Sequence, residues 1–146
     1  MRLLLITLLS SFLISNITWE TDFQRAKQSA RAEHKCILLN FAGSDWCGPC
    51  IRLHNQIFES NVFTKYAGDQ LILVKADFPR LKKNQLSKEQ QMQNDKLADE
   101  YNKKGVFPLT LLLNPEGKIL KSWDGFPNES ADEFTNEVKA AVNADK

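Results

Sequence analysis

The feature that most constrains this chain is a pair of cysteines, Cys47 and Cys50, placed shortly after an apolar run of strand length at 37–42. If the run is a strand and a helix begins near Cys47, the first thiol lies at a helix N-terminus, where unpaired N–H groups and the macrodipole favour a thiolate. Cys50 then lies one turn along, on the same side of the helix and within reach of a disulfide. The spacing therefore predicts a reversible dithiol with an acidic, accessible Cys47.

A Cys-x-x-Cys pair also occurs as half of a zinc site or as a static bridge. A structural zinc site usually adds a second pair of ligands, and this chain has no second Cys-x-x-Cys sequence. The candidate ligands are His34, Cys36, Cys47, Cys50 and His54. We therefore expect no metal site, and we favour redox cycling over a static bridge.

Two further residues near the pair carry reactive groups. Cys36, at the head of the apolar run, is either a reactive third thiol or a buried, inert cysteine, and the second interpretation is favoured. His54 lies one turn past Cys50 and either tunes that thiol or packs as a half-buried side chain. Packing is favoured because His54 shares a predicted helix face with Ile51 and Phe58.

The composition is that of one ordinary globular domain. The chain has 146 residues, of which 42% are hydrophobic and 25% are charged, so it is long enough to bury a core. Its formal net charge is +1, which gives no overall field to attract nucleic acid or an anionic membrane. We exclude both classes of partner on that basis.

The first residues differ from the rest. Arg2 supplies a positive charge, and Leu3–Ile14 is an apolar stretch shorter than the roughly 20 residues that a spanning helix needs. The pattern predicts a signal peptide over 1–17, without fixing the cleavage site, ahead of one domain over 18–146. An uncleaved anchor is the alternative. Export to the periplasm or the cell exterior follows, and in an oxidising compartment a passive thiol pair would become a static disulfide.

Apolar periodicity and capping motifs predict alternating helices and strands. We expect helices from a capping box at Thr21 to Glu33, over Cys47–Glu59, over Ser87–Asn102, and from a second capping box at Ser130 onward. We expect strands over Cys36–Ala42, Leu71–Phe78, Leu109–Leu113 and Lys118–Trp123, the last pair antiparallel. The helix after the motif is expected to place Ile51, His54, Ile57 and Phe58 on one face and to break at Ser60 and Asn61. This order predicts an α/β fold with a central mixed sheet and helices on both faces.

The motif at 46–50, the strand before it, the order of elements and Phe107-Pro108 ahead of a strand together resemble the thioredoxin superfamily. The resemblance covers nearly everything after the signal segment and implies the thioredoxin fold. It implies that Pro108 is a cis-proline opposite the thiols, and that the backbone beside it pairs with an extended substrate. Gly125 matches a glycine beside the same groove, and Lys75 matches a lysine near the buried thiol.

The substrate-binding residues expected on this basis are Trp46, Gly48, Pro49, Phe107, Pro108 and Gly125. Trp46 either shields the pair and contacts substrate or packs the loop that carries it. A departure from cytosolic thioredoxins is Asn40, which stands where they carry a buried aspartate. Because asparagine cannot accept a proton, any base for Cys50 has to be water, Lys75 or the Cys47 thiolate as leaving group.

A second departure is the segment Pro79–Lys96, which cytosolic thioredoxins lack. Together with the signal segment and the sequences Gly-Ser-Asp-Trp-Cys and Asp-Phe-Pro, it resembles the exported disulfide reductase and isomerase branch sometimes called DsbH. The segment carries the cations Arg80, Lys82, Lys83 and Lys88. They either attract acidic substrates, if their loop borders the groove, or form a solvated loop, which is the favoured interpretation.

These features predict thiol-disulfide exchange in disulfide-containing exported proteins. Cys47 attacks as a thiolate, and Cys50 resolves the mixed disulfide. The dipeptide Gly48-Pro49 is the family's reducing-type pattern, which favours a reductase or isomerase fed by a membrane-linked electron donor and using no small-molecule cofactor. The alternatives are a non-catalytic binding module and a dedicated thiol reductant for cytochrome or metal-centre assembly.

Overall fold

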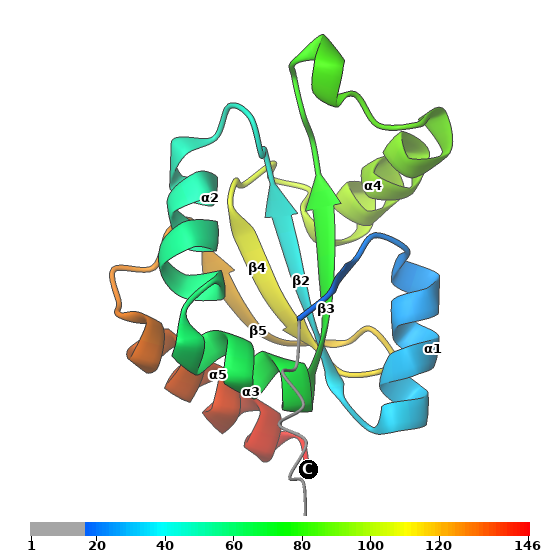
Figure 1. The fold of residues 1–146 in the computed structure, drawn as a ribbon. Coiled ribbons are helices and arrows are strands. Elements are labelled where there is room, and N and C mark those ends of the chain that lie inside the picture. Colours follow the sequence, from blue (N-terminus) through cyan, green and yellow to red (C-terminus); the bar gives the residue numbers. More distant parts are fainter. Residues whose placement is uncertain (1–16) are drawn as a thin grey trace, which may run out of the picture.

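The computed structural model describes residues 17–146, which are built around a five-stranded sheet (Figure 1). The strands are β1 Trp19–Glu20, β2 Cys36–Ala42, β3 Leu71–Asp77, β4 Leu109–Leu113 and β5 Ile119–Asp124, in the spatial order β1-β3-β2-β4-β5. β1, β3 and β2 run parallel, β4 is antiparallel to β2, and β5 is antiparallel to β4. The predicted mixed sheet is confirmed.

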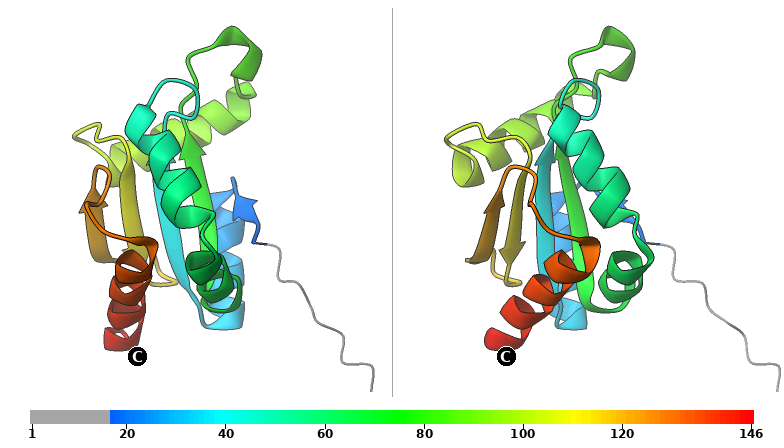
Figure 2. Two further views of the ribbon diagram at one scale, coloured as in Figure 1. Left: turned by 60° about the vertical axis from the view of Figure 1, so that its left-hand side comes forward. Right: turned by 90° about the vertical axis from the view of Figure 1, so that its left-hand side faces the viewer.

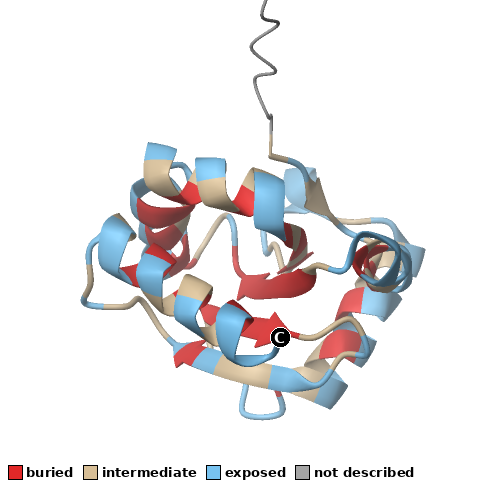
Figure 3. Ribbon diagram, turned by 90° about the horizontal axis from the view of Figure 1, so that it is seen from below, coloured by how far each residue is buried: buried red, intermediate tan, exposed pale blue. Residues whose placement is uncertain are grey.

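The helices are α1 Phe23–Glu33, α2 Gly48–Leu53, the π-helix η1 His54–Phe58, α3 Asn61–Gln70, the 3₁₀-helix η2 Lys82–Asn84, α4 Lys88–Tyr101 and α5 Ala131–Ala144. One core cluster joins α1 and α4 to one face of the sheet, and another joins α2, η1, α3 and α5 to the opposite face (Figures 1 and 2). Buried residues lie mainly on the three central strands, β3, β2 and β4, and on the inner sides of the helices (Figure 3). Helices therefore cover both faces, as predicted.

Strand β2 fixes the position of the site. It is buried along its whole length, as its largely apolar sequence predicts. Ile37, Leu39 and Phe41 belong to the core on the α1 and α4 side, whereas Leu38 belongs to the core on the other side. Because β3 and β4 hold β2 from either side, the point where it ends at Ala42 is held firmly.

Capping boxes were predicted at the starts of the first and last helices, α1 and α5. At α1 the N-cap is Asp22, not Thr21, because the Asp22 carboxylate accepts the N–H groups of Gln24 and Arg25. At α5 the predicted box is confirmed, since the Ser130 hydroxyl accepts the Glu133 N–H and the Glu133 carboxylate accepts the Ser130 N–H.

Three elements, β1, α3 and the short η2, were not predicted. Ser60, expected only to break a helix, accepts the Phe63 N–H at 3.3 Å and thereby caps α3. Phe63 and Ala67 of α3 then enter the core. β1 has 2 residues, which is too short for a periodic pattern.

The face that the helix after the motif was expected to share was partly wrong, because Ile51 does not lie with the buried Ile57 and Phe58. Ile51 is 42% exposed, whereas Leu53 is 1% exposed and packs in the core beside Ile57. The reason is that Cys50 and Leu53 share the face toward the sheet, so Ile51, one residue past Cys50, is rotated about 100° from it.

The predicted signal peptide, 1–17, lies outside the described residues except for Ile17, which packs against the core. Within 17–146, no helix combines the length and apolar character needed to cross a membrane. Cys36 is 7% exposed in the core, and burial raises the pKa of its thiol. The interpretation of Cys36 as a buried cysteine is confirmed.

Candidate active site

The candidate active site lies where β2 ends and α2 begins. The chain leaves the sheet at Ala42, turns through 43–46 and enters α2 with Cys47 as the N-cap. Cys47 and Cys50 form a disulfide whose Cα atoms are 5.2 Å apart. The Cys47 sulfur accepts the backbone N–H of Cys50 at 3.2 Å. Both sulfurs therefore lie at the N-terminus of a helix.

The sequence of the first helical turn suits this geometry. Pro49 lacks an N–H, but the first N–H groups of a helix have no partner within the helix, so no helical hydrogen bond is lost there. The Cys50 N–H remains and is directed at the Cys47 sulfur. When the disulfide is reduced, this donor and the partial positive charge of the helix N-terminus favour a thiolate at Cys47.

The disulfide is more covered than expected. Cys47 and Cys50 are each 5% exposed, and they form a small apolar cluster with Ala42 against which Trp46 and Phe107 pack. The expectation of an accessible Cys47 is therefore wrong for the disulfide form. Trp46 and Phe107 therefore cover part of the disulfide.

Beside the disulfide, the Phe107–Pro108 peptide bond is cis, as the resemblance implies. The Gly125 N–H donates to the Pro108 carbonyl at 2.8 Å, which joins the end of β5 to the start of β4. Gly125 has φ 82°, a conformation that glycine adopts without strain. Phe107 meets Trp46 edge to face with ring centroids 5.5 Å apart. The fold thus brings these residues to the same edge of the sheet as Cys47.

Trp46 is held from several sides. Its indole N–H donates to the Phe78 carbonyl at 2.7 Å, and the Arg80 guanidinium lies 3.7 Å from a Trp46 ring centroid. The ring also lies against Gly43, where an added Cβ would be 2.2 Å from Trp46 Cε2. Trp46 therefore packs its loop and borders the disulfide at once, so the two interpretations of this residue do not exclude each other.

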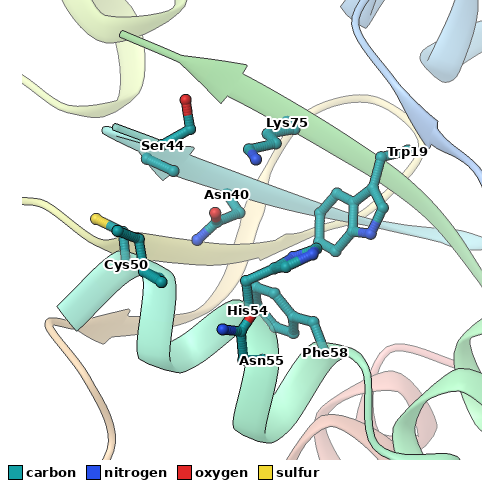
Figure 4. Close-up of a pocket in the computed structure, with 10 residues that line it drawn as sticks. Trp19, Asn40, Ser44, Cys50, His54, Asn55, Phe58 and Lys75 are labelled. Carbon is teal, nitrogen blue, oxygen red and sulfur yellow. The ribbon is translucent and has the colours of Figure 1, made fainter. Parts of the chain in front are cut away.

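A pocket of about 270 Å³ lies behind Cys50. Figure 4 shows Asn40 from β2, Lys75 from β3 and His54 around it, on the side of α2 that carries Cys50. Asn40 and Lys75 are paired neighbours in the β2–β3 register. The two residues predicted to lie near the second thiol therefore line one cavity with it.

The side chains around this pocket differ in how firmly they are held. Asn40 is 5% exposed, and its amide donates to the Thr110 hydroxyl at 3.1 Å and to the Leu109 carbonyl at 3.4 Å. The Nε2 atom of His54 lies 3.2 Å from the Oε1 atom of Glu59, and the His54 side chain is 40% exposed. The Asn40 amide is thus held by hydrogen bonds to β4, whereas His54 is half-buried and less constrained.

Sequence reasoning missed the role of Asp45. Its carboxylate accepts the N–H groups of Arg80 and Leu81 at 2.9 and 3.0 Å and the Asn84 amide at 2.9 Å. These hydrogen bonds hold the pKa of Asp45 below its usual range, with the Arg80 N–H as the largest cause. An aspartate in a turn commonly accepts backbone N–H groups close to it in sequence. Nothing in the sequence around Asp45 shows that its partner is instead the Arg80 N–H, 35 residues away.

Among residues 17–146, no three His, Cys, Asp or Glu side chains gather closely enough to hold a metal ion. The expectation that the protein uses neither metal nor cofactor stays a prediction. Of the remaining predicted residues, Gly48 and Pro49 are exposed on the first turn of α2.

Residues 18–115 match the family described as Thioredoxin-like. The chain belongs to the thioredoxin-like family. Among its relatives is the disulfide bond reductase DsbH of Chlamydia pneumoniae, which is 36% identical over 128 residues, or 88% of this chain and 74% of that protein. The solved structure of a DsbH oxidoreductase matches with a TM-score of 0.78 at 36% identity, covering 88% of this chain and 85% of that one.

More distant relatives share the fold. The thioredoxin-related protein DsbJ of Chlamydia pneumoniae is 27% identical over 130 residues, which make up 89% of this chain but 36% of DsbJ. A disulphide isomerase from Xylella fastidiosa Temecula1 has a TM-score of 0.61 at 18% identity, with 85% of this chain and 98% of that chain covered. The thioredoxin fold and the resemblance to DsbH are both confirmed. Kinship with a disulfide bond reductase, together with the Cys47–Cys50 disulfide, confirms the predicted class of activity for this thioredoxin-like chain, thiol-disulfide oxidoreduction.

We predict that Gly43→Ala displaces the Trp46 ring, because a Cβ at this position would lie 2.2 Å from the indole. The hydrogen bond from the indole N–H to Phe78 should be lost, which costs about 1 kcal/mol or more of unfolding free energy. The indole N–H resonance in NMR spectra and urea denaturation measure these effects. Gly48→Ala is the control, since nothing lies within 4 Å of its added Cβ. An unshifted Trp46 resonance in Gly43→Ala would show that the ring does not depend on Gly43.

Proposed function

We propose that this protein is an exported thiol-disulfide oxidoreductase that reduces or isomerises disulfides in other exported proteins. The observation that carries the proposal is the Cys47–Cys50 disulfide at the N-terminus of α2, beside Pro108. It occurs in a chain 36% identical to DsbH, a disulfide bond reductase of Chlamydia pneumoniae.

In the proposed reaction the reduced enzyme attacks first. The Cys47 thiolate forms a bond to one substrate sulfur, the substrate disulfide breaks, and the other substrate sulfur leaves as a thiolate that takes a proton from solvent. Cys50 then attacks the Cys47 sulfur of this mixed disulfide, so that the second substrate sulfur leaves and the Cys47–Cys50 disulfide forms. Two electrons pass from the enzyme to the substrate. In isomerisation, a substrate thiol displaces Cys47 instead.

The attack by Cys50 requires that its thiol loses a proton. The Asn40 side chain cannot accept this proton, because an amide is not basic and this one donates to Thr110 and Leu109. Lys75 lines the same pocket as Cys50, and the pocket is large enough for water. The proton acceptors that fit are therefore water, Lys75 and the departing Cys47 thiolate, and Asn40 has a positioning role.

For substrate binding we propose the rim around the disulfide. Trp46 and Phe107 pack against the cluster that holds the sulfurs, and a hydrogen bond joins Gly125, just after β5, to Pro108, just before β4. An extended polypeptide laid along Phe107-Pro108 would bring its own disulfide to Cys47 by backbone pairing, as in other strand-addition complexes. Gly48 and Pro49, on the first turn of α2, are exposed, so the substrate polypeptide can extend past them.

The place of action follows from the amino-terminal sequence. Residues 1–17 have the pattern of a signal peptide, and we propose that the domain over 18–146 works in the periplasm or outside the cell. An oxidising compartment would hold Cys47–Cys50 as a disulfide, so a reductase there needs a donor that restores two electrons after each cycle. We propose a membrane-linked dithiol donor.

We predict that Cys47→Ser lowers insulin reduction to the uncatalysed rate, because it removes the attacking sulfur. Cys50→Ser should accumulate covalent complexes through Cys47, because the mixed disulfide is no longer resolved. A turbidity assay and non-reducing gels with identification of the captured proteins measure both. Cys36→Ala, which changes the buried third cysteine, is the control and should retain activity. Full activity in Cys47→Ser would contradict the assignment, and capture restricted to cytochrome or metal-centre assembly proteins would favour a dedicated assembly reductant.

We also predict that the Cys47–Cys50 couple is reducing. With Gly48-Pro49 between the cysteines, its potential should lie nearer to about −270 mV, the value for thioredoxin, than to about −120 mV, the value for the oxidant DsbA. Equilibration with glutathione redox buffers, followed by quantification of the free thiols, measures it. A potential as oxidising as that of DsbA would overturn the proposed direction.

A further inference from the structure

The segment 79–88, called the basic loop from here on, concentrates positive charge. Its sequence Pro-Arg-Leu-Lys-Lys-Asn-Gln-Leu-Ser-Lys holds four cations and no acidic residue, in a chain whose formal net charge is +1. Its cations, Arg80, Lys82, Lys83 and Lys88, are exposed. Leu81 between them is 47% exposed. The loop therefore presents charge, and one apolar side chain, to whatever approaches it.

The basic loop is attached to the residues that lead into the disulfide. Asp45 accepts hydrogen bonds from the N–H groups of Arg80 and Leu81, and the Trp46 indole donates to the Phe78 carbonyl just before the loop. The loop rises beyond the sheet at the same end as the start of α2 (Figures 1 and 2). It thus borders the candidate active site, which the sequence alone left open.

The charge of the loop is largely uncompensated. Asp45 offsets part of it from the motif side, Asp77 is engaged by the Ser44 N–H and hydroxyl, and Glu89 follows the loop at the start of α4. In the part of the chain that the structure describes, the ion pairs involve other cations than the four of the loop. Positive charge beside the disulfide is therefore available to an external partner.

Arg80 is the best oriented of these cations. Its guanidinium lies 3.7 Å from a Trp46 ring centroid, and stacking on an aromatic ring leaves the edge of a guanidinium free to donate. The paired N–H groups along that edge bind a carboxylate with two parallel hydrogen bonds. Because Trp46 directly precedes Cys47, a carboxylate on Arg80 would belong to a residue close to the substrate cysteine.

We propose that the basic loop binds an acidic, extended polypeptide segment of the substrate, adjacent to the disulfide that Cys47 attacks. This inference rests on the proposed function and adds a substrate class to it. Arg80 binds one carboxylate beside Trp46, and Lys82 and Lys83 attract further Asp or Glu residues. Opposite charge at the rim of an interface mainly raises the association rate, and salt weakens the effect.

The test uses disulfide-bonded peptides that differ only in the residues flanking one cysteine, either Glu or the uncharged Gln. With the reduced wild-type protein at low ionic strength, kcat/KM for the Glu peptide should exceed that for the Gln peptide about tenfold, the lower end of electrostatic steering effects. The preference should fall towards onefold in about 0.5 M salt, where screening shortens the reach of exposed charges.

The variant Lys82→Gln/Lys83→Gln should lower this preference, leaving the part that Arg80 supplies, and should reduce the Gln peptide at the wild-type rate. The matched control is Lys65→Gln/Lys118→Gln, which removes the same charge from exposed positions on α3 and on the β4–β5 turn. That turn follows Leu113, which pairs with Ile37 at the opposite end of β2 from the disulfide. The control should keep the full preference.

The possible results separate the inference from the proposed function. If the wild-type protein reduces neither peptide, the proposed function fails. If it reduces both at equal rates, or if the preference for Glu is as large in Lys82→Gln/Lys83→Gln as in the wild type, the function stands and the binding role of the basic loop is overturned. Reduction of the Gln peptide also reports that each variant is folded.

Discussion

The rest of the site depends on the hydrogen bond between the Cys50 N–H and the Cys47 sulfur, at the point where α2 begins. This contact exists because β2 is buried along its length and ends at Ala42, and because a short turn then delivers Cys47 to the helix as its N-cap. The helix N-terminus favours negative charge on that sulfur, and the sheet fixes where the sulfur lies. Chemistry at Cys47 therefore follows from the junction of one strand and one helix.

Two segments distant in sequence then shape what can approach this junction. On one side, Pro108 and Gly125 join β4 and β5 beside the disulfide. On the other, Asp45 holds the segment after β3, and Trp46 packs between that segment and Phe107. The first side is the one that the thioredoxin resemblance implies, and the second depends on a segment that cytosolic thioredoxins lack. The proposed chemistry thus belongs to the family, whereas the proposed preference for acidic substrates belongs to this added segment.

The helices and strands that short sequence patterns encode could be predicted from the sequence. The apolar run of β2, in which Asn40 is the one polar residue, and the Ser130 capping box predicted elements that the structure confirms. The predicted break at Ser60 is confirmed, but its cap on α3 was missed, because the same residue ends one helix and begins the next, and only the core position of Phe63 shows that a second helix follows. The hydrogen bonds of Asp45 escaped prediction for a different reason, since their donors lie about 35 residues away and become neighbours only when β2 and β3 pair.

The most direct test is the pH dependence of alkylation at Cys47 in the reduced protein. The variant Cys36→Ala/Cys50→Ser leaves a single thiol and retains the backbone N–H at position 50 that the Cys47 sulfur accepts. A helix N-terminus that favours the thiolate predicts that the iodoacetamide rate reaches half its maximum below about pH 8.5, the value for a free cysteine. A midpoint at or above that value, with a rate at neutral pH no faster than that of an ordinary thiol, would contradict the role assigned to the start of α2.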